Sequence, residues 1–250
     1  MRRQAALFLL AMQLLTRLPT PRVDYTPERM AASLAYHPLI GALIGALAAA
    51  AYGAASLALP HASAAVIAVI AAAFLTGGLH EDGLADTFDG VGGGKDREGA
   101  LAIMRDSRLG AYGALALILC AALKLSALAA LPMAAAMTAL VLGHSLSRLS
   151  CVALVASSVY ARPSGAAKDV AEGGATSLFG AVFFSLAIAA ASLLVVPFEA
   201  VLAGLLGCAL GHGAMRLYFE RKLGGYTGDT LGATQQASEA ALYLGVLAAL

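Results

Sequence analysis

Long apolar segments separated by short polar connections dominate the chain and predict a bundle of membrane-spanning helices. An α-helix needs roughly 20 mostly apolar residues to cross a bilayer, and most of these segments reach that length. The last apolar segment has the polar residues TQQASE in its first half, so it spans the membrane only if it inserts fully. We therefore expect an all-α integral membrane protein with six or seven transmembrane helices, forming one domain over residues 1–250. The expected spans are residues 30–59, 62–78, 111–131, 133–160, 177–196, 199–218 and 229–250.

Shorter helices are expected outside these spans. Residues 1–18 place two arginines before a short leucine-rich run, which suits a helix lying on the membrane surface. No small-residue cleavage pattern follows it, so we expect it to be retained. The helix of the second span is expected to continue through residues 79–89. Gly92–Gly94 predict a flexible loop, and Asp96 begins a short helix that ends near residue 105.

Charge is scarce and unevenly placed. Only 12% of residues are charged, about half the share in a soluble domain, and the net charge of +1 gives no reason to expect a nucleic-acid partner. The connections near residues 60, 131 and 197 contain no Lys or Arg. The positive-inside rule therefore places the basic connections in the cytoplasm, and with seven spans the C-terminus lies outside. The basic connections are the N-terminus and residues 95–108, 162–168 and 216–222.

The stretch GGLHEDGLADTFDG, residues 77–90, carries the most informative pattern. Asp82, Asp86 and Asp89 are spaced so that a helix places them within about 60° of one face. Carboxylates this close repel one another and lose solvation at a membrane edge, and a divalent cation relieves both costs. Oxygen ligands without a His or Cys set favour Mg²⁺ or Mn²⁺. The sequence thus predicts a Mg²⁺ site at the membrane rim, with Glu81 as a further candidate ligand.

Cationic side chains near these acids suggest a phosphate-bearing substrate. Arg105 and Arg108 follow about twenty residues later, and guanidinium groups match phosphate oxygens in pairs. Arg148 lies about three turns inside the fourth span, where it must meet a carboxylate, a phosphate or a water-filled cavity. Lys124 also lies within a span, and we expect its amine to snorkel to the membrane surface.

Other polar residues allow two interpretations each. Asp229 follows the glycine-rich stretch GGYTGD and is expected either to cap the last helix or to act as a ligand. His37 and His80 lie at membrane edges, where hydrogen bonding is the commoner role and general-base catalysis the alternative. The three cysteines lie in apolar segments, which is typical of buried thiols.

Four ordered motifs closely resemble the cobalamin synthase (adenosylcobinamide-GDP ribazoletransferase) family of bacterial and archaeal membrane enzymes. The motifs are GGLHEDGLADTFDG at 77–90, IMRDSRLGAYG at 103–113, RP-x-G at 162–165 and GGYTGDTLGA at 224–233. The resemblance implies a cell inner-membrane enzyme, its active site facing the cytoplasm, that completes adenosylcobalamin. Its substrates would be adenosylcobinamide-GDP and α-ribazole or its 5′-phosphate, with Mg²⁺ as cofactor and GMP as leaving group. It leaves open a homo-oligomer and contacts with other corrinoid-pathway enzymes.

The resemblance also assigns residue roles. Asp82, Asp86 and Asp89, with Glu81, would hold Mg²⁺ against the diphosphate, and one of these carboxylates or His80 would take the hydroxyl proton. The candidate substrate-binding residues, several of which would neutralise the leaving GMP, are Arg105, Asp106, Arg108, Arg148, Arg162 and Asp229.

Three alternatives fit less well. A CDP-alcohol phosphotransferase requires DG-x-x-AR, which the acidic stretch lacks, and a UbiA-like prenyltransferase requires two separated Asp-rich motifs, of which one is present. A divalent-cation transporter usually places its carboxylates at the bilayer midplane, whereas these lie at one edge.

Overall fold

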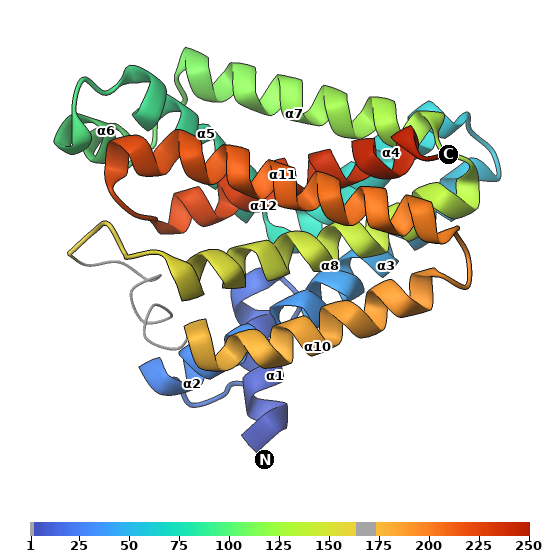
Figure 1. The fold of residues 1–250 in the computed structure, drawn as a ribbon, viewed down its shortest axis with the longest axis horizontal. Coiled ribbons are helices and arrows are strands. Elements are labelled where there is room, and N and C mark those ends of the chain that lie inside the picture. The colour runs from blue at the N-terminus through green and yellow to red at the C-terminus, as the bar shows by residue number, and fades with distance from the viewer. Residues whose placement is uncertain (1–2, 164–173) are drawn as a thin grey trace.

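The computed structural model describes residues 3–163 and 174–250, except the side chains of residues 174 and 175, and within this part of the chain the regular secondary structure is helical (Figure 1). Its one extended pairing is an isolated bridge between Tyr160 and Tyr226. The expected all-α class is confirmed. The helices are α1 (Arg3–Leu15), α2 (Pro27–Ser33), η1 (Leu34–Tyr36), α3 (His37–Ser56), α4 (His61–Thr76), α5 (Leu79–Gly93), α6 (Arg97–Ile103), α7 (Ala111–Ala130), α8 (Met133–Ser157), α10 (Gly174–Ser192), α11 (Phe198–Leu223) and α12 (Gly228–Ala248).

Fewer helices pass as membrane spans than the six or seven expected. Among the described residues four are long and apolar enough, namely Pro27–Ser56, α7, α8 and α11, or five if α4 and α5 form one bent span. The described apolar part of α10 is shorter, and α12 carries buried Gln235, Gln236 and Glu239. Because other helices enclose these polar side chains, α12 does not need the continuous apolar surface that marks a lipid-facing helix.

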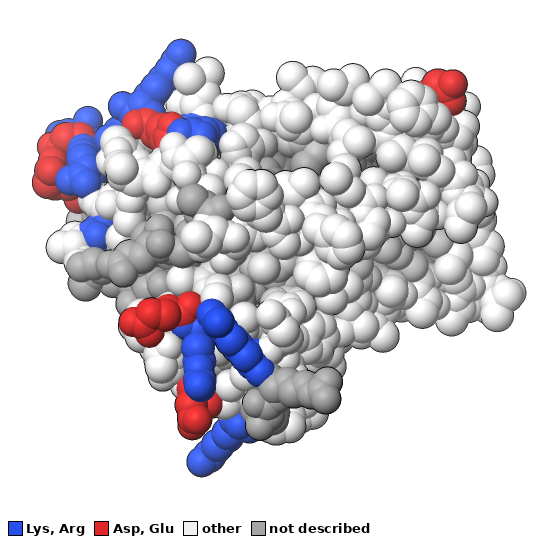
Figure 2. Space-filling model, turned by 60° about the horizontal axis from the view of Figure 1, so that its bottom comes forward, with Lys and Arg blue, Asp and Glu red and all other residues white. Residues whose placement is uncertain are grey.

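The charged side chains gather at one end of the bundle. In Figure 1, α7, α8 and α11 run along the long axis, with the connections that hold α6 and the turn between α11 and α12 at the left end. Figure 2 shows most charges of one face at this end and around the N-terminal segment, while the rest of that face is uncharged apart from an acidic side chain at the opposite end. The C-terminus lies at the opposite end (Figure 1). This segregation is what a bundle with one polar membrane edge requires.

Glycines allow the central helices to approach closely. An added Cβ at Gly41 of α3 would lie 2.1 Å from the His144 carbonyl oxygen of α8, and at Gly207 of α11 it would lie 2.2 Å from the Ala241 carbonyl of α12. Such distances are too short for any side chain, so only glycine fits. Small residues at helix crossings are the usual means of packing helices in bilayers.

A sharp bend separates α4 from α5, contrary to the single continuous helix expected here. Gly77 and Gly78 have φ values of 69° and 72°, a left-handed conformation that favours glycine, and the two helix axes meet at 90°. The Gly78 amide donates to the Ala73 carbonyl at 2.9 Å, which closes the end of α4. The acidic helix is therefore a separate element with its own direction.

The segment after α5 is also more ordered than a flexible loop. α5 continues through Gly93, and Gly94 packs so closely that an added Cβ would lie 2.5 Å from the Ala100 amide nitrogen of α6. Asp96 caps α6, as expected, by accepting the Gly99 amide at 2.7 Å. These contacts fix the C-terminal end of the acidic helix.

Candidate active site

The site is built where α5 crosses α12. An added Cβ at Gly83 would lie 2.6 Å from the Asp229 carbonyl oxygen, and one at Gly232 would lie 3.0 Å from the His80 carbonyl oxygen. The two backbones thus touch through glycines. This contact brings Asp82 of the acidic helix and Asp229 of the last helix, 147 positions apart in the sequence, to one cavity.

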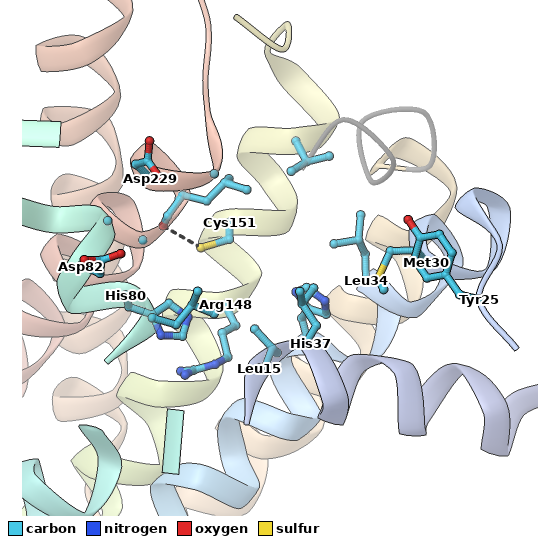
Figure 3. Close-up of a pocket in the computed structure, with 17 residues that line it drawn as sticks. Leu15, Tyr25, Met30, Leu34, His37, His80, Asp82, Arg148, Cys151 and Asp229 are labelled. Carbon is cyan, nitrogen blue, oxygen red and sulfur yellow. Dashed lines mark hydrogen bonds between the residues drawn. The ribbon is translucent and has the colours of Figure 1, made fainter. Parts of the chain in front are cut away.

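That cavity, which we call the main cavity, measures about 290 Å³. Asp82, His80, Arg148 and Asp229 line it together with His37 (Figure 3). Apolar side chains complete the wall, including contributions from the N-terminal helix. The apolar lining consists of Leu14, Leu15, Tyr25, Met30, Leu34, Leu79, Cys151, Val155 and Leu231.

A second cavity, of about 670 Å³, is also lined by Asp82. Glu81 and Asp82 line it, together with Arg17 and the glycines of the α4–α5 bend. Leu14 and Leu79 line both cavities. α1 is therefore a wall of the candidate site, a role that its amphipathic sequence did not indicate.

Asp229 pairs with an arginine and does not cap the helix. Thr227 is the N-cap of α12 and forms a capping box with Thr230, so the expectation of a capping Asp229 is wrong. Arg162 donates from Nη2 to Asp229 Oδ2 at 2.7 Å, and both side chains are largely buried. The Tyr160–Tyr226 bridge holds Arg162 there, because the Ala161 amide donates to the Tyr226 carbonyl at 2.8 Å. Of the RP-x-G motif, residues 164 and 165 lie outside the described residues.

The carboxylates of α5 interact as the sequence predicted. Asp82, Asp89 and Asp229 lie close enough to repel the carboxylate of Asp86, and Arg162 attracts it. Among the described residues no three His, Cys, Asp or Glu side chains converge to enclose a metal ion. Mg²⁺ usually takes only one or two carboxylates and completes its shell with water and substrate phosphates. Asp82, which lines both cavities, and Asp86, one turn further along α5, would suit this mode of binding, although Asp86 lines neither cavity as the described residues define them.

Asp89 makes a structural contact as well. Its Oδ2 accepts the Gly110 amide and its Oδ1 the Gly113 amide, both at 2.8 Å, at the start of α7. Gly110 is the N-cap of α7 and has no side chain, so Asp89 supplies the missing cap from α5. An added Cβ at Gly113 would lie 2.4 Å from Asp89 Oδ2. The motifs at 77–90 and 103–113 thus interlock at this carboxylate.

The loop between α6 and α7 holds Arg105, Asp106 and Arg108 at the surface. Arg108 donates to Asp106 from Nε at 3.0 Å, and these hydrogen bonds hold the pKa of the Asp106 carboxyl below its ordinary value. Arg105 is exposed. As far as the described residues define them, neither cavity is lined by these arginines, although the adjacent Leu109 lines the second.

Lys124 is buried in an ion pair, so the expectation that its amine snorkels is wrong. Its Nζ lies 2.7 Å from Glu239 Oε1 and donates to Gln236 Oε1 at 2.6 Å. Both Lys124 and Glu239 are at most 6% exposed. The polar face of α12 offers partners closer than the membrane surface, and a buried charge held by hydrogen bonds is less costly than an unpaired one.

Glu239 is the centre of a buried polar network that the sequence pattern did not predict. Its carboxylate contacts His144 Nδ1 at 3.0 Å and accepts from the Tyr243 hydroxyl at 3.1 Å. Gln236 extends the network to the acidic helix by donating to Glu81 Oε1 at 3.0 Å. The available signal was the spacing of Gln235, Gln236, Glu239 and Tyr243 along one face of an otherwise apolar helix.

Arg148 lines the main cavity, and a cavity is one of the three environments that the sequence predicted for it. Its side chain is 1% exposed, and its Nη1 donates to the His144 carbonyl at 2.8 Å. Its Nε and Nη2 make no hydrogen bond within the described residues, and the same is true of His37 Nε2. Buried polar atoms without a partner cost free energy, so these atoms favour a bound polar ligand or an ordered water.

Comparison with known proteins yields a consistent set of relatives. The model of the cobalamin-5-phosphate synthase family matches residues 7–247. Similar proteins named adenosylcobinamide-GDP ribazoletransferase come from Shewanella piezotolerans (43% identical, covering 97% of this chain and 95% of its own) and Leptothrix cholodnii (44%, covering 98% and 96%). Another from Shewanella amazonensis is 39% identical over 98% of this chain and 96% of its own. No solved structure matches the chain.

Proposed function

The chain belongs to the cobalamin-5-phosphate synthase family, and from this premise we propose that it joins adenosylcobinamide-GDP to α-ribazole or α-ribazole 5′-phosphate with Mg²⁺ as cofactor. It is a transferase, and its relatives are named adenosylcobinamide-GDP ribazoletransferase. The observation that carries the proposal is one cavity lined by Asp82 and Asp229 of two crossing helices and by the buried Arg148.

The transfer forms one P–O bond and breaks another. The ribazole hydroxyl oxygen attacks the phosphorus that bears cobinamide, and the bond from this phosphorus to the bridging oxygen breaks. GMP leaves with that oxygen and its electron pair. The hydroxyl proton passes to a group lining the main cavity, either His80 or a carboxylate of α5 or α12.

The protein's part in this reaction is positioning and charge compensation. Asp82 and Asp86 would hold Mg²⁺, which when bound offsets charge on the diphosphate and on departing GMP. Asp89 fixes α5 against the start of α7. The role of Glu81 and Asp89 as additional Mg²⁺ ligands remains a prediction. Arg162, whose Nε is buried without a partner in the described residues, would compensate phosphate charge next to Asp229.

Placement in the membrane follows from the same proposal. The charged end of the bundle carries the candidate site and the basic connections, so we assign it to the cytoplasmic side of the inner membrane. Arg105 and Arg108 would then stand at the edge of the site, where a guanine nucleotide arrives from the cytoplasm.

Reconstitution tests the proposal. Purified protein in liposomes, given adenosylcobinamide-GDP, α-ribazole or its 5′-phosphate, and Mg²⁺, should release GMP and form the cobamide. Asp82→Asn should abolish release, while Asp24→Asn, at a side chain that is 97% exposed in a surface pair, serves as the matched control.

Three outcomes would contradict it. Release of CMP from a CDP-alcohol, with no cobamide formed, would assign the chain to the CDP-alcohol phosphotransferase reaction. Passage of Mg²⁺ across the same liposomes, without transfer, would favour a transporter. Chelation of Mg²⁺ without loss of transfer would remove the metal from the mechanism.

A further inference from the structure

Arg97, at the start of α6, bonds two other parts of the chain that reach it from different helices. Its Nε donates to the Leu223 carbonyl at 2.8 Å, and its Nη2 donates to the Ala161 carbonyl at 2.6 Å. Both acceptor residues are buried. A guanidinium group can hold two acceptors at once, because its donors point in fixed directions within one plane. Arg97 therefore links two distant segments of the chain at one point.

The two segments lead to the two members of one ion pair. The Ala161 carbonyl belongs to the peptide bond that joins Ala161 to Arg162. Leu223 ends α11, and the turn after it leads into α12, whose second residue is Asp229. The Arg162 and Asp229 side chains bond to each other at 2.7 Å. Arg97 thus holds both of the segments that carry this pair.

The segment that carries Arg162 is restrained from both sides. The Ala161 amide donates to the Tyr226 carbonyl at 2.8 Å, while the Ala161 carbonyl accepts from Arg97. Pro163 follows Arg162, and a residue before proline is restricted to extended backbone conformations. Because little freedom is left in the backbone of Arg162, the restraint that Arg97 imposes on the peptide reaches the Arg162 side chain.

A lysine fastens the same assembly to the acidic helix. Lys222, the neighbour of Leu223, donates from Nζ to the Val91 carbonyl at 2.8 Å and also to the Gly94 carbonyl. Val91 lies in the last turn of α5 and Gly94 is its C-cap, a place where cations commonly bond the free carbonyls of a helix. The end of α5, the end of α11 and the Ala161 segment are therefore joined by two cationic side chains.

We propose that Arg97 is a positioning residue for the transfer reaction, which keeps Arg162 in place beside Asp229. This inference rests on the proposed function, in which Arg162 compensates phosphate charge. As far as the described residues define the cavities, Arg97 lines neither of them, so its influence on transfer passes through Arg162. In the sequence alone it is one more cation of a basic connection, since its two acceptors lie 126 and 64 positions away.

Transfer kinetics test the positioning role. Arg97→Gln should lower kcat/KM about tenfold, because Arg162 loses part of its restraint and a displacement of about 1 Å already costs on the order of 100-fold. Arg97→Lys keeps the charge but lacks the planar pair of donors, so we expect a loss of about threefold. Lys95→Gln removes an exposed cation from the same connection and is the matched control, with transfer expected within twofold of the wild type.

A double variant shows whether Arg97 acts through Arg162. In an Arg162→Gln background, Arg97→Gln should lower kcat/KM by no more than about twofold, because the side chain that it positions is already gone. An equal loss in both backgrounds would mean that Arg97 only supports the fold, and it would overturn the inference. Near-normal transfer by Arg97→Gln alone would overturn it as well.

Chemical modification tests the same geometry without any substrate. Phenylglyoxal attacks guanidinium groups, and Arg162 is protected in the wild type because its side chain is 13% exposed and bonded to Asp229. In lipid nanodiscs, the modification of Arg162 measured by peptide mass should be at least fivefold faster in Arg97→Gln. The exposed Arg105 should react at the same rate in both proteins. An unchanged rate at Arg162 would contradict the inference.

The two measurements separate this inference from the proposed function. If the wild type forms no cobamide, the proposed function fails, and the modification rate alone decides whether Arg97 positions Arg162. If the wild type transfers normally and Arg162 reacts equally in both proteins, the inference is wrong while the proposed function stands. If Arg162→Gln leaves no measurable transfer, the modification rate again decides. If Arg97→Gln does not fold, Arg97→Lys takes its place, with at least twofold faster modification of Arg162 expected and an unchanged rate contradicting the inference.

Discussion

Gly83→Ala should disable the enzyme by moving one helix relative to another. The new Cβ would lie 2.6 Å from the Asp229 carbonyl oxygen and 3.1 Å from the Asp229 Cα, both backbone atoms that no side-chain rotation can relieve. Ordinary contact begins at 3.4 Å. α5 and α12 must therefore separate by about 0.8 Å, on the scale of the displacement that overpacking forces on well-packed helices.

The expected magnitudes follow from this displacement. Overpacking costs about 1–3 kcal/mol, and replacing glycine by alanine inside a helix returns about 1 kcal/mol, so the net loss of stability should be small. Asp82 and Asp229 lie on the two separating helices. A misplacement of about 1 Å costs on the order of 100-fold in rate, so kcat/KM should fall between 10-fold and 100-fold.

Gly213→Ala provides the control for this substitution. Gly213 lies inside α11 with nothing within 4 Å of an added Cβ, so the same chemical change meets no neighbour. Both variants should be assayed for GMP release and for unfolding in mixed micelles. If Gly83→Ala transfers within twofold of Gly213→Ala, the close contact between α5 and α12 does not set the geometry of the site, and the reasoning is refuted.

Three other predictions concern the carboxylates, the metal and the buried ion pair. Asp82→Asn and Asp86→Asn should each reduce transfer below about 1% with normal membrane insertion, and near-normal turnover of both would end the metal-site hypothesis. Enzyme treated with EDTA should regain activity with Mg²⁺ or Mn²⁺ more than with Ca²⁺, whose larger, more flexible shell fits this mode poorly; equal recovery with Ca²⁺ would argue against it. Lys124→Met and Glu239→Gln should each cost about 3 kcal/mol of unfolding free energy in an SDS titration, because each leaves a buried charge unpaired. The double variant should cost clearly less than both losses together, and a coupling below about 0.5 kcal/mol would show that the pair does not act as a unit.

The sequence was sufficient for whatever depends on local composition and spacing. Apolar segment length established the membrane class, and the i, i+4, i+7 pattern placed Asp82, Asp86 and Asp89 on one helix. Capping of α6 by Asp96 was likewise readable, because a cap depends on residues within one turn. The acidic motif itself could thus be recognised as a candidate site before any fold was known.

The tertiary structure decided which distant residues meet, because those contacts depend on how the helices cross. The left-handed pair Gly77 and Gly78 turned the acidic helix by 90°, and the contact at Gly83 brought Asp229 to it. The same packing placed Lys124 against Glu239, a pairing between residues 115 positions apart. A lysine that would reach the membrane surface on an isolated helix finds a nearer carboxylate in the bundle, and no spacing rule along one helix contains that information.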